Sequence, residues 1–350
     1  MAYRVVQWNT GNVGTQTLKA ILQHPDLELA GCFAWSEAKA GVDAGELVGE
    51  APVGVVATRD VDALLELGAD CVCYTPLWPD LDTLCRILAS GTNVTTTAAF
   101  LTGHGSFGEA GRARLRQACE QGQTSIMGTG MHPGFSNLMA LATAGACNRI
   151  DKITITESQD ASGYASAETQ RSVGFDDPID SPHLTAKVRE GSLVFSDGLY
   201  VMAEALGITL DAVDFEARFA PATADSDLGF MVIRKGHVAG VEGRWLGKLG
   251  GRTVFDVGFR WKMGAHVEEP WPIEHAYLLE VQGSPTLKLR MEIRPPRDFV
   301  ARSPDDWMSL GMIITGLPAV HAIPAVCEAP AGLRSYADLP LVTAKGCVAG

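Results

Sequence analysis

The first 130 residues alternate short apolar runs with helical patterns, and this alternation limits the fold more than any other feature of the chain. Strands that alternate with helices of about ten residues form right-handed βαβ units around a parallel sheet. The expected strands are residues 4–8, 27–34, 69–74, 93–97 and 124–127, and the expected helices are 15–23, 61–67, 81–89 and 107–121. The sequence therefore predicts a doubly wound α/β domain over residues 1–135.

The pattern changes after Pro133. A helix of small and apolar residues is expected at 137–147, and strands of period two follow at 152–157, 255–261 and 287–293. Such alternation is typical of an antiparallel sheet with one covered face. We predict a second α+β domain, built on a largely antiparallel sheet, over residues 136–304. Residues 305–350 would form a C-terminal segment whose helix at 305–320 returns to the first domain, with prolines breaking up the tail.

Large apolar side chains recur at period two in the second domain, as at Phe255, Phe259 and Trp261. A domain of this size has few helices left to cover both faces of its sheet. We therefore expect a homodimer that forms through this sheet, since a two-fold dimer is the commonest closed oligomer.

The charge balance indicates the class of partner. The chain has 41 acidic and 28 basic residues, a net charge of -13, which argues against nucleic acid or an anionic membrane surface as the main partner. No apolar run is expected to reach the roughly 18 residues that span a bilayer. The chain begins directly with a strand and has no basic leader or cleavage site. These features predict a cytoplasmic protein that acts on a small molecule.

The first βα turn carries two glycines three residues apart, Gly11 and Gly14. A turn of this kind lets the backbone approach a pyrophosphate at the positive end of a helix. The full dinucleotide fingerprint has another glycine three residues earlier, where Trp8 stands. The position of the turn still favours a Rossmann-type cofactor site formed by Thr10, Gly11, Asn12, Val13 and Gly14. The alternative is a plain tight turn in another doubly wound fold.

The end of the second strand discriminates between the two nicotinamide cofactors. An acidic residue there would bind the ribose hydroxyls of NAD. This sequence has Trp35 and Ser36 in that place, and Lys39 can neutralise a 2′-phosphate while Trp35 covers the adenine. The pattern favours NADP. NAD stays open as the alternative, because a shift of one residue would make Glu37 the ribose-binding acid.

Ligands of a doubly wound sheet lie at the carboxyl ends of its strands. Tyr74, Thr75, Pro76 and Thr97 follow such strands and are expected to line the cofactor. His132 follows the last strand of the first domain, where Pro133 and flanking glycines fix the backbone, and its imidazole suits proton transfer near neutral pH.

The second domain contributes two further candidates for proton transfer. Tyr164 can donate a proton from its phenol, and Glu168 can supply a carboxylate; the plain alternatives are a wall residue and a helix N-terminal charge. The histidines and cysteines show no metal-ligand spacing, so no metal site is predicted. The Gly-x-Ser-x-Gly elbow of many hydrolases is absent after every expected strand.

Several segments resemble a known family. The segments are Gln7–Gly14 (QWNTGNVG), Val42–Leu47, Gly128–Phe135 (GTGMHPGF), Ser162–Tyr164 and Ala322–Cys327. Together they resemble dihydrodipicolinate-reductase-like NAD(P)-dependent oxidoreductases, related to native amine dehydrogenases and 2,4-diaminopentanoate dehydrogenase. The resemblance spans the chain and implies hydride transfer, a Rossmann domain, a substrate and dimerisation domain, and a C-terminal return.

Two departures from the family patterns limit this expectation. The paired histidines of true dihydrodipicolinate reductases are missing, which argues against that activity. Native amine dehydrogenases carry a glutamate segment after the fourth strand, and here Ala99 and Phe100 occupy both acidic places.

We therefore expect an NAD(P)H-dependent oxidoreductase that transfers a hydride to or from a C=O or C=N group of a small, mostly apolar substrate. One alternative is a cofactor-binding sensor or catalytically silent paralogue. The other is an amine dehydrogenase whose carboxylate comes from Glu168 or Asp160.

Overall fold

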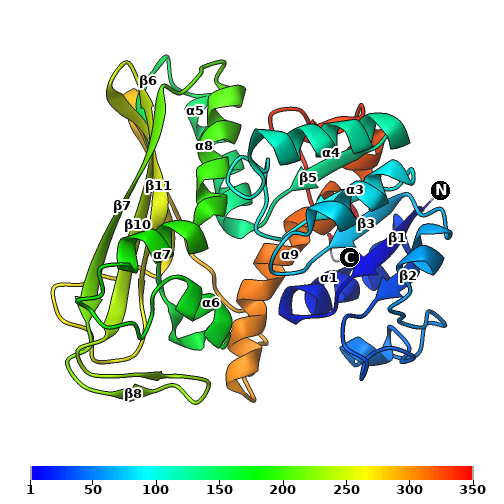
Figure 1. The fold of residues 1–350 in the computed structure, drawn as a ribbon, viewed down its shortest axis with the longest axis horizontal. Helices are drawn as coiled ribbons and strands as arrows, with labels where there is room; N and C mark the ends of the chain where they lie inside the picture. The colour runs from blue at the N-terminus through cyan, green and yellow to red at the C-terminus, as the bar shows by residue number, and fades with distance from the viewer. Residues whose placement is uncertain (1, 349–350) are drawn as a thin grey trace. The chain divides into compact units, whose positions relative to one another are not determined.

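In the computed structural model, which describes residues 2–348, the chain divides into two compact units (Figure 1). Unit 1 contains the residues up to Phe135 together with those from Gly311 onward. Unit 2 is the continuous segment Ser136–Leu310. The C-terminal return to unit 1 thus begins at Gly311, inside a helix.

Unit 1 is built on a parallel six-stranded sheet with the order β14-β5-β4-β3-β1-β2. A parallel bridge between Phe33 and Thr58 continues the pairing beyond β2. With that bridge the segment at Thr58 and strands β2, β1, β3, β4 and β5 follow the 3-2-1-4-5-6 arrangement of dinucleotide-binding folds, and β14 is an additional strand beside β5. The switch point lies between β1 and β3. The predicted Rossmann-type sheet is confirmed. Its strands are β1 (Tyr3–Trp8), β2 (Leu27–Phe33), β3 (Cys71–Tyr74), β4 (Asn93–Thr96), β5 (Ser125–Gly128) and β14 (Gly332–Arg334).

Helices pack on the sheet of unit 1 through several apolar clusters, and two of them show that the strands are buried on both sides. One contains Leu84, Ile87 and Leu115 from α3 and α4, with Val6 and Val72 from the strands. The other joins α1 and α9 to the alternate strand residues Val5, Cys71 and Cys73. Strands that are buried on both sides explain the continuous apolar runs of this half of the sequence. The elements are α1 (Asn12–Gln23), η1 (Glu46–Val48), α2 (Val61–Leu65), α3 (Leu81–Ala89), α4 (Gly108–Gly122), η2 (Met131–Phe135) and α9 (Pro304–Glu328).

Two sequence expectations about α9 were wrong. The helix continues through Pro318 and Pro324 to Glu328, although each internal proline costs about 3 kcal/mol. Burial of Val320, Ile323 and Val326, all at 0% exposure, opposes that cost. The stretch Asp306–Glu328 also has the length and the mean hydropathy (1.7) of a membrane span, which the sequence analysis missed. Val320, Ile323 and Val326 of this stretch pack in the core of unit 1, and 39% of its most apolar window is buried.

Unit 2 is built on a mixed six-stranded sheet with the order β13-β12-β6-β11-β10-β7. The β6–β11 pair is parallel and the other pairs are antiparallel, which confirms the predicted α+β domain. Its strands are β6 (Arg149–Asp160), β7 (Ala212–Pro221), β10 (Val238–Leu249), β11 (Arg252–Lys262), β12 (Ala276–Ser284) and β13 (Leu287–Met291), with a small hairpin of β8 (Ser226–Asp227) and β9 (Val232–Ile233). Its helices are α5 (Ser136–Ala144), η3 (Ala161–Gly163), α6 (Ala167–Ser172), α7 (Leu184–Gly191) and α8 (Leu193–Ala205).

The two faces of this sheet differ sharply. One is apolar and is covered within the unit by α5 and α8; Phe195 of α8 lies 5.1 Å from Phe259 between ring centroids. The argument for a dimer through exposed Phe255 and Phe259 was therefore wrong, because both are buried inside unit 2. The opposite face carries ion pairs such as Lys152–Asp256 (2.6 Å) and Arg260–Glu242 (2.7 Å).

Candidate active site

The glycine turn lies at the switch point of the unit 1 sheet, between the carboxyl ends of β1 and β3. A Cβ at Gly14 would lie 2.3 Å from the Asn9 carbonyl oxygen and 2.7 Å from Thr75 Oγ1. Only glycine fits there, because backbone atoms cannot give way as a flexible side chain can. A Cβ at Gly11 would meet nothing within 4 Å. The turn thus packs tightly on one side and leaves open space at Gly11.

A buried amide supports this turn from below. Gln7 is fully buried, and its Nε2 donates to the Asn9 carbonyl (2.8 Å) and to Thr75 Oγ1 (3.0 Å). Its Oε1 accepts from the Thr17 hydroxyl of α1 at 2.9 Å. The sequence analysis missed Gln7 and Thr17; a fully polar residue inside an apolar strand was the available signal. This network fixes Asn9 in the left-handed conformation (φ 74°) that starts the turn.

The residues present fit a dinucleotide cofactor on two observations. Asn9 Oδ1 is buried without a hydrogen-bond partner among residues 2–348, so one polar atom of the turn remains to be satisfied. Helix α1 begins directly after Gly11, with no side-chain cap and no acidic residue in its first turn. Such a helix end favours a phosphate.

The loop after β2 brings Lys39 to the turn. Its Nζ donates to the Thr10 carbonyl at 2.5 Å. Ser36 is exposed and accepts a hydrogen bond from the backbone of Ala38 (3.2 Å), while Trp35 is 76% exposed. Glu37, the competing acid, pairs with Arg59 at 2.7 Å. The chain thus places two cations, Lys39 and Arg59, and a neutralised acid in one loop region.

The other expected cofactor residues differ in what they expose. The Tyr74 side chain is buried against Trp8, and its hydroxyl accepts from the Asp80 backbone (3.2 Å), which leaves only its backbone for a ligand. The Thr75 hydroxyl donates to the Trp8 carbonyl at 2.9 Å. Pro76, Thr97 and Val13 are half-buried, whereas Asn12 is exposed.

The two positions that replace the family glutamates are not equivalent. Phe100 is fully buried and belongs to the core that α3 and α4 form, with its ring 5.9 Å from that of Phe107. Ala99 is half-buried, and its carbonyl accepts from the Ser106 hydroxyl. A carboxylate can therefore be accommodated at residue 99 much more readily than at residue 100.

His132 lies in the irregular segment η2 that ends unit 1. The segment follows Gly128, where a Cβ would lie 2.1 Å from the Phe100 carbonyl oxygen. Gly134 has a φ of 132°, which a residue with a side chain rarely adopts. These glycines explain the specific GTGMHPGF motif, and they hold the half-buried His132 beyond the carboxyl end of β5.

In unit 2, Tyr164 and Glu168 lie near the end of β6 but in different environments. Tyr164 is half-buried, and burial raises the pKa of its phenol while a hydrogen bond from Thr169 lowers it. Glu168 is exposed in the first turn of α6. Asp160 accepts from the Ser162 backbone at 3.0 Å and pairs with Lys262 at 3.4 Å. Asp160 thus has structural partners and is a poor substitute for the missing carboxylate.

Sequence reasoning missed a further carboxyl, that of Glu157 in β6. Glu157 shares the covered face of the sheet with Ile153 and Ile155, since alternate strand residues share a face. It is half-buried by exposed area, yet the dense surroundings raise its pKa to about 8 by desolvation, against a smaller lowering by Trp261. A carboxyl with such a pKa is a functional-site candidate.

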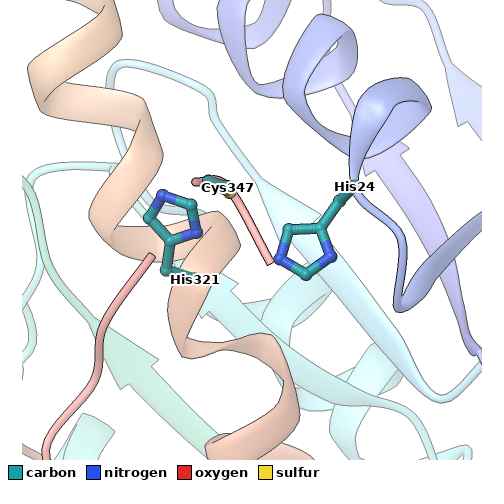
Figure 2. A group of neighbouring side chains, drawn as sticks. All are labelled: His24, His321 and Cys347. Carbon is teal, nitrogen blue, oxygen red and sulfur yellow. The ribbon is translucent and has the colours of Figure 1, made fainter. Parts of the chain in front are cut away.

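Three potential metal ligands converge in unit 1, although they are far apart in the sequence. His24, His321 and Cys347 each offer a ligand atom within 4.8 Å of the others (Figure 2). The His24 Nδ1 accepts a hydrogen bond from the Asp26 backbone at 3.1 Å, so Nε2 carries the proton in the neutral ring. A metal at Nε2 would require that hydrogen bond to break. The prediction of no metal site stays a prediction.

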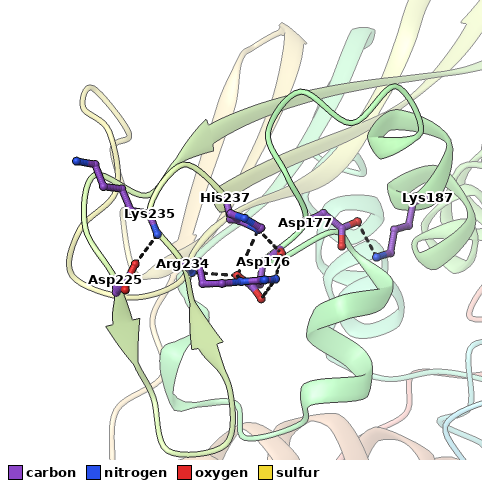
Figure 3. Close-up of polar contacts among 7 residues, drawn as sticks. All are labelled: Asp176, Asp177, Lys187, Asp225, Arg234, Lys235 and His237. Carbon is purple, nitrogen blue, oxygen red and sulfur yellow. Dashed lines mark hydrogen bonds and ion pairs between the residues drawn. The ribbon is translucent and has the colours of Figure 1, made fainter.

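A polar cluster of unit 2 surrounds Asp176 (Figure 3). Arg234 donates to its carboxylate at 2.8 Å, and His237 Nδ1 lies 2.7 Å from its carbonyl oxygen. Burial acts to raise the pKa of Asp176, but the hydrogen bonds and charge of Arg234 hold it below its usual value. Arg234 follows β9 directly, so this cluster fixes the β8–β9 hairpin to the loop after α6 and has a structural role.

Comparison with known proteins decides the family. Residues 136–347 match the 2,4-diaminopentanoate dehydrogenase C-terminal domain. The chain belongs to this family. An amine dehydrogenase from Streptomyces virginiae is 28% identical over 358 residues, which cover 97% of each chain. A 4-hydroxy-tetrahydrodipicolinate reductase from Neisseria gonorrhoeae is 31% identical over 112 residues, 32% of this chain and 39% of that protein.

The solved structure of an amine dehydrogenase from Mycobacterium smegmatis has the same fold. It aligns with a TM-score of 0.75 at 19% identity, covering 98% of this chain and 97% of that one. As a member of that family, this chain is an NAD(P)-dependent oxidoreductase, as the sequence predicted.

One of the segments that carry the family resemblance has a structural explanation. Asp43 of the Val42–Leu47 segment accepts hydrogen bonds from the backbone of Gly45 (2.8 Å), Val53 (2.9 Å) and Gly54 (2.8 Å). The pKa of its carboxyl is lowered, chiefly by the hydrogen bond from Val53. These hydrogen bonds close a surface loop, so this segment of the dehydrogenase family has a structural role.

Proposed function

We propose that the protein is an NADP-dependent oxidoreductase that transfers a hydride between the cofactor and a C=O or C=N group of a small, mostly apolar substrate. The observation that supports it most is the turn at the switch point, where Gly14 packs on the backbone and Gly11 leaves room for a pyrophosphate. The nicotinamide supplies or accepts the hydride, and the chain supplies binding, orientation and proton handling.

The preference for NADP rests on charge around the adenosine side of the turn. Lys39 reaches the turn itself, Ser36 is exposed beside it, and the carboxylate of Glu37 is engaged by Arg59. A 2′-phosphate would find cations there, whereas a ribose diol would find no unpaired acid. Trp35, with most of its indole exposed, is proposed to cover the adenine. Thr10, Asn12, Val13, Thr75 and Thr97, with the backbone of Tyr74 and Pro76, complete the proposed cofactor contacts.

Proton handling is assigned to His132 and Tyr164, with Glu168 as a further candidate. His132 is held by glycines with special backbone requirements, and the phenol of Tyr164 stays protonated because burial raises its pKa. A neutral phenol can donate a proton to the oxygen of a C=O group, or to the nitrogen of a C=N group, as that group is reduced.

Assembly as a homodimer is also proposed. With the apolar face of the unit 2 sheet covered, the charged face is the remaining sheet surface for a two-fold contact. Light scattering at micromolar concentration and rising salt tests this assembly, and a monomer at low salt would contradict it.

A cofactor-binding sensor, or a catalytically silent paralogue, is the second candidate. The observation in its favour is Phe100, whose burial in the core excludes a carboxylate at one of the two family positions.

The experiment that separates the two measures cofactor binding and turnover in parallel. NADPH and NADH affinities are measured by fluorescence, and turnover by loss of NADPH absorbance with aldehydes and ketones, with and without ammonia. Tight NADPH binding with turnover supports the oxidoreductase, whereas binding without turnover over the whole panel supports the sensor.

The proton donors are tested in the same assay. Tyr164→Phe and His132→Ala are each expected to reduce turnover by about 100-fold or more, with NADPH affinity changed only a few-fold. If neither variant loses more than about ten-fold in rate, the donor is another group or water.

A further inference from the structure

A carboxyl without a cation lies on the covered face of the unit 2 sheet. Glu157 pairs in register with Phe259 of β11 and Tyr277 of β12, so both rings flank it in one row across the sheet. Phe259 is fully buried and Tyr277 is 5% exposed. Within residues 2–348 no ion pair reaches Glu157, and no cation is among the groups that shift its pKa. Acidic side chains in such places are normally paired.

Two more aromatic side chains approach the same carboxyl. Trp261 lies two residues beyond Phe259 on the same face of β11. Its ring stacks on that of Phe259, with centroids 3.9 Å apart. Its Nε1 is close enough to lower the pKa of Glu157, yet it is buried without completing a hydrogen bond. Tyr164 is also near, because the charge of Glu157 raises the pKa of its phenol, as it does for Tyr277.

Aromatic side chains therefore surround the Glu157 carboxyl without burying it completely. Glu157, Tyr164 and Trp261 each keep some accessible surface. Aromatic rings attract ammonium groups through their faces, and a carboxylate adds a charge-assisted hydrogen bond. Binding of a neutral carbonyl compound does not require both the aromatic faces and the carboxylate.

We propose that Glu157, Tyr164, Trp261 and Tyr277 form a subsite that binds the ammonium group of an alkylamine. This inference rests on the proposed oxidoreductase function and deepens it, because it assigns the substrate nitrogen to unit 2.

Amine binding at this subsite is expected to release a proton. Desolvation raises the pKa of Glu157, so it keeps its proton to a higher pH than an ordinary carboxyl, whereas an alkylammonium group, like that of lysine, has a pKa of about 10.4 and stays charged. The cation favours the ionised carboxyl, so the O–H bond of Glu157 breaks and its proton goes to the buffer. We expect proton release on amine binding to be large at pH 6 and almost absent at pH 9.5.

The test is calorimetric titration of the full-length protein with cyclohexylammonium and with its neutral counterpart cyclohexanol. The titrations are run in buffers of different ionisation enthalpy, with and without NADP⁺. Glu157→Gln is expected to weaken cyclohexylammonium at least about ten-fold and to abolish proton release, while cyclohexanol binding stays unchanged. Glu280→Gln, on the opposite face of the same sheet, is the matched control and should change neither ligand.

The outcomes separate this subsite from the proposed function. Equal amine affinity in Glu157→Gln and wild type, or amine binding without proton release, would overturn the subsite; NADPH turnover with a carbonyl substrate would then leave the oxidoreductase intact. Proton-releasing amine binding without any turnover would support the subsite and count against the oxidoreductase. If Glu157→Gln does not fold, the proton release of the wild type and the weakened amine binding expected for Trp261→Phe decide the matter.

Discussion

The unusual carboxyl of Glu157 makes the stability of the protein depend on pH in a way that one substitution should remove. Glu157→Gln keeps the shape of the side chain but cannot ionise. The pKa of the wild-type carboxyl is raised from its usual 4.5 to about 8, mainly because burial penalises the charged form. In the unfolded chain the same group returns to its usual value.

The sign of the effect follows from proton binding. Between about pH 4.5 and pH 8 the folded protein holds a proton on Glu157 that the unfolded chain has lost. The free energy of unfolding of the wild type therefore falls as pH rises through this window and levels off above pH 8. Below pH 4.5 both states are protonated and the group contributes nothing.

The magnitude has an upper limit of about 5 kcal/mol, from a pKa difference of 3.5 and 1.36 kcal/mol per unit. Glu157 retains accessible surface, so water offsets part of the desolvation, and we expect about 2–3 kcal/mol. Relative to wild type, Glu157→Gln should gain this amount between pH 5 and pH 9.

Urea unfolding, followed by tryptophan fluorescence at pH 5, 7 and 9, measures the difference between the two proteins. Groups that titrate equally in both cancel, and Glu280→Gln controls for loss of an acid from the same sheet. A wild-type-to-variant difference that stays constant from pH 5 to pH 9 would refute the reasoning. A difference of opposite sign would mean that the ionised carboxyl has a cationic partner in the folded state.

Four further outcomes are expected. Lys39→Ala should weaken NADPH about ten-fold or more and barely change NADH, measured by cofactor fluorescence, and equal losses would contradict the NADP assignment. Gly11→Ala should leave the urea midpoint unchanged but weaken NADPH, whereas Gly14→Ala should also destabilise the fold by about 1–3 kcal/mol, because its Cβ meets backbone. Asp176→Asn should cost about 1.5–3 kcal/mol at pH 7, and this cost should fade in acid as the wild-type carboxylate, whose pKa is lowered, becomes protonated. Ala99→Glu should create or raise reductive amination with ammonia; a folded, NADPH-binding variant without that gain would mean that the pocket itself has diverged from amine dehydrogenases.

The sheet of unit 1 could be predicted from the sequence because its signals are local. Strand β3 (CVCY) is a continuous apolar run, β4 (NVTT) is rich in β-branched residues, and α3 buries Leu84, Ile87 and Leu88, so composition, period and length identify them. The start of α1 at Asn12, three residues before the expected Thr15, was hidden because Gly11 and Gly14 weaken helix propensity at that end.

Other features depend on contacts that period and propensity do not encode. Helix α8, which covers the apolar sheet face, contains Ser196, Asp197 and Gly198 among its buried residues and shows a weak amphipathic pattern. The apolar surface of Phe255 and Phe259 therefore looked available for a dimer contact. Likewise, Pro318 and Pro324 indicate helix breaks locally, but the surrounding side chains are held by the sheet of unit 1.

The candidate site shows the same division. Gly11 and Gly14 were identified because a strand, a turn and a helix are adjacent in sequence. Gln7 escaped notice because its partner Thr75 is 68 residues away. Glu157 had a readable signal: it follows Ile153 and Ile155 at period two, which puts a carboxyl on an apolar face. What the sequence cannot provide is its neighbours, since Phe259 and Tyr277 join it only through sheet register.

Phe100 occupies one of the two positions of the missing family glutamates and is tightly packed. A Cβ added at Gly103 would lie 2.9 Å from the Phe100 ring, and one at Gly128 would lie 2.1 Å from its carbonyl oxygen. Phe100 is therefore packed on both its side chain and its backbone, and a glutamate in its place would bury a charge in the core of α3 and α4. A chain that has adopted this packing cannot recover the acid there by a single substitution. Among the carboxyls present in unit 2, Glu157 combines partial burial with aromatic neighbours, whereas Asp160 is already paired and Glu168 is exposed.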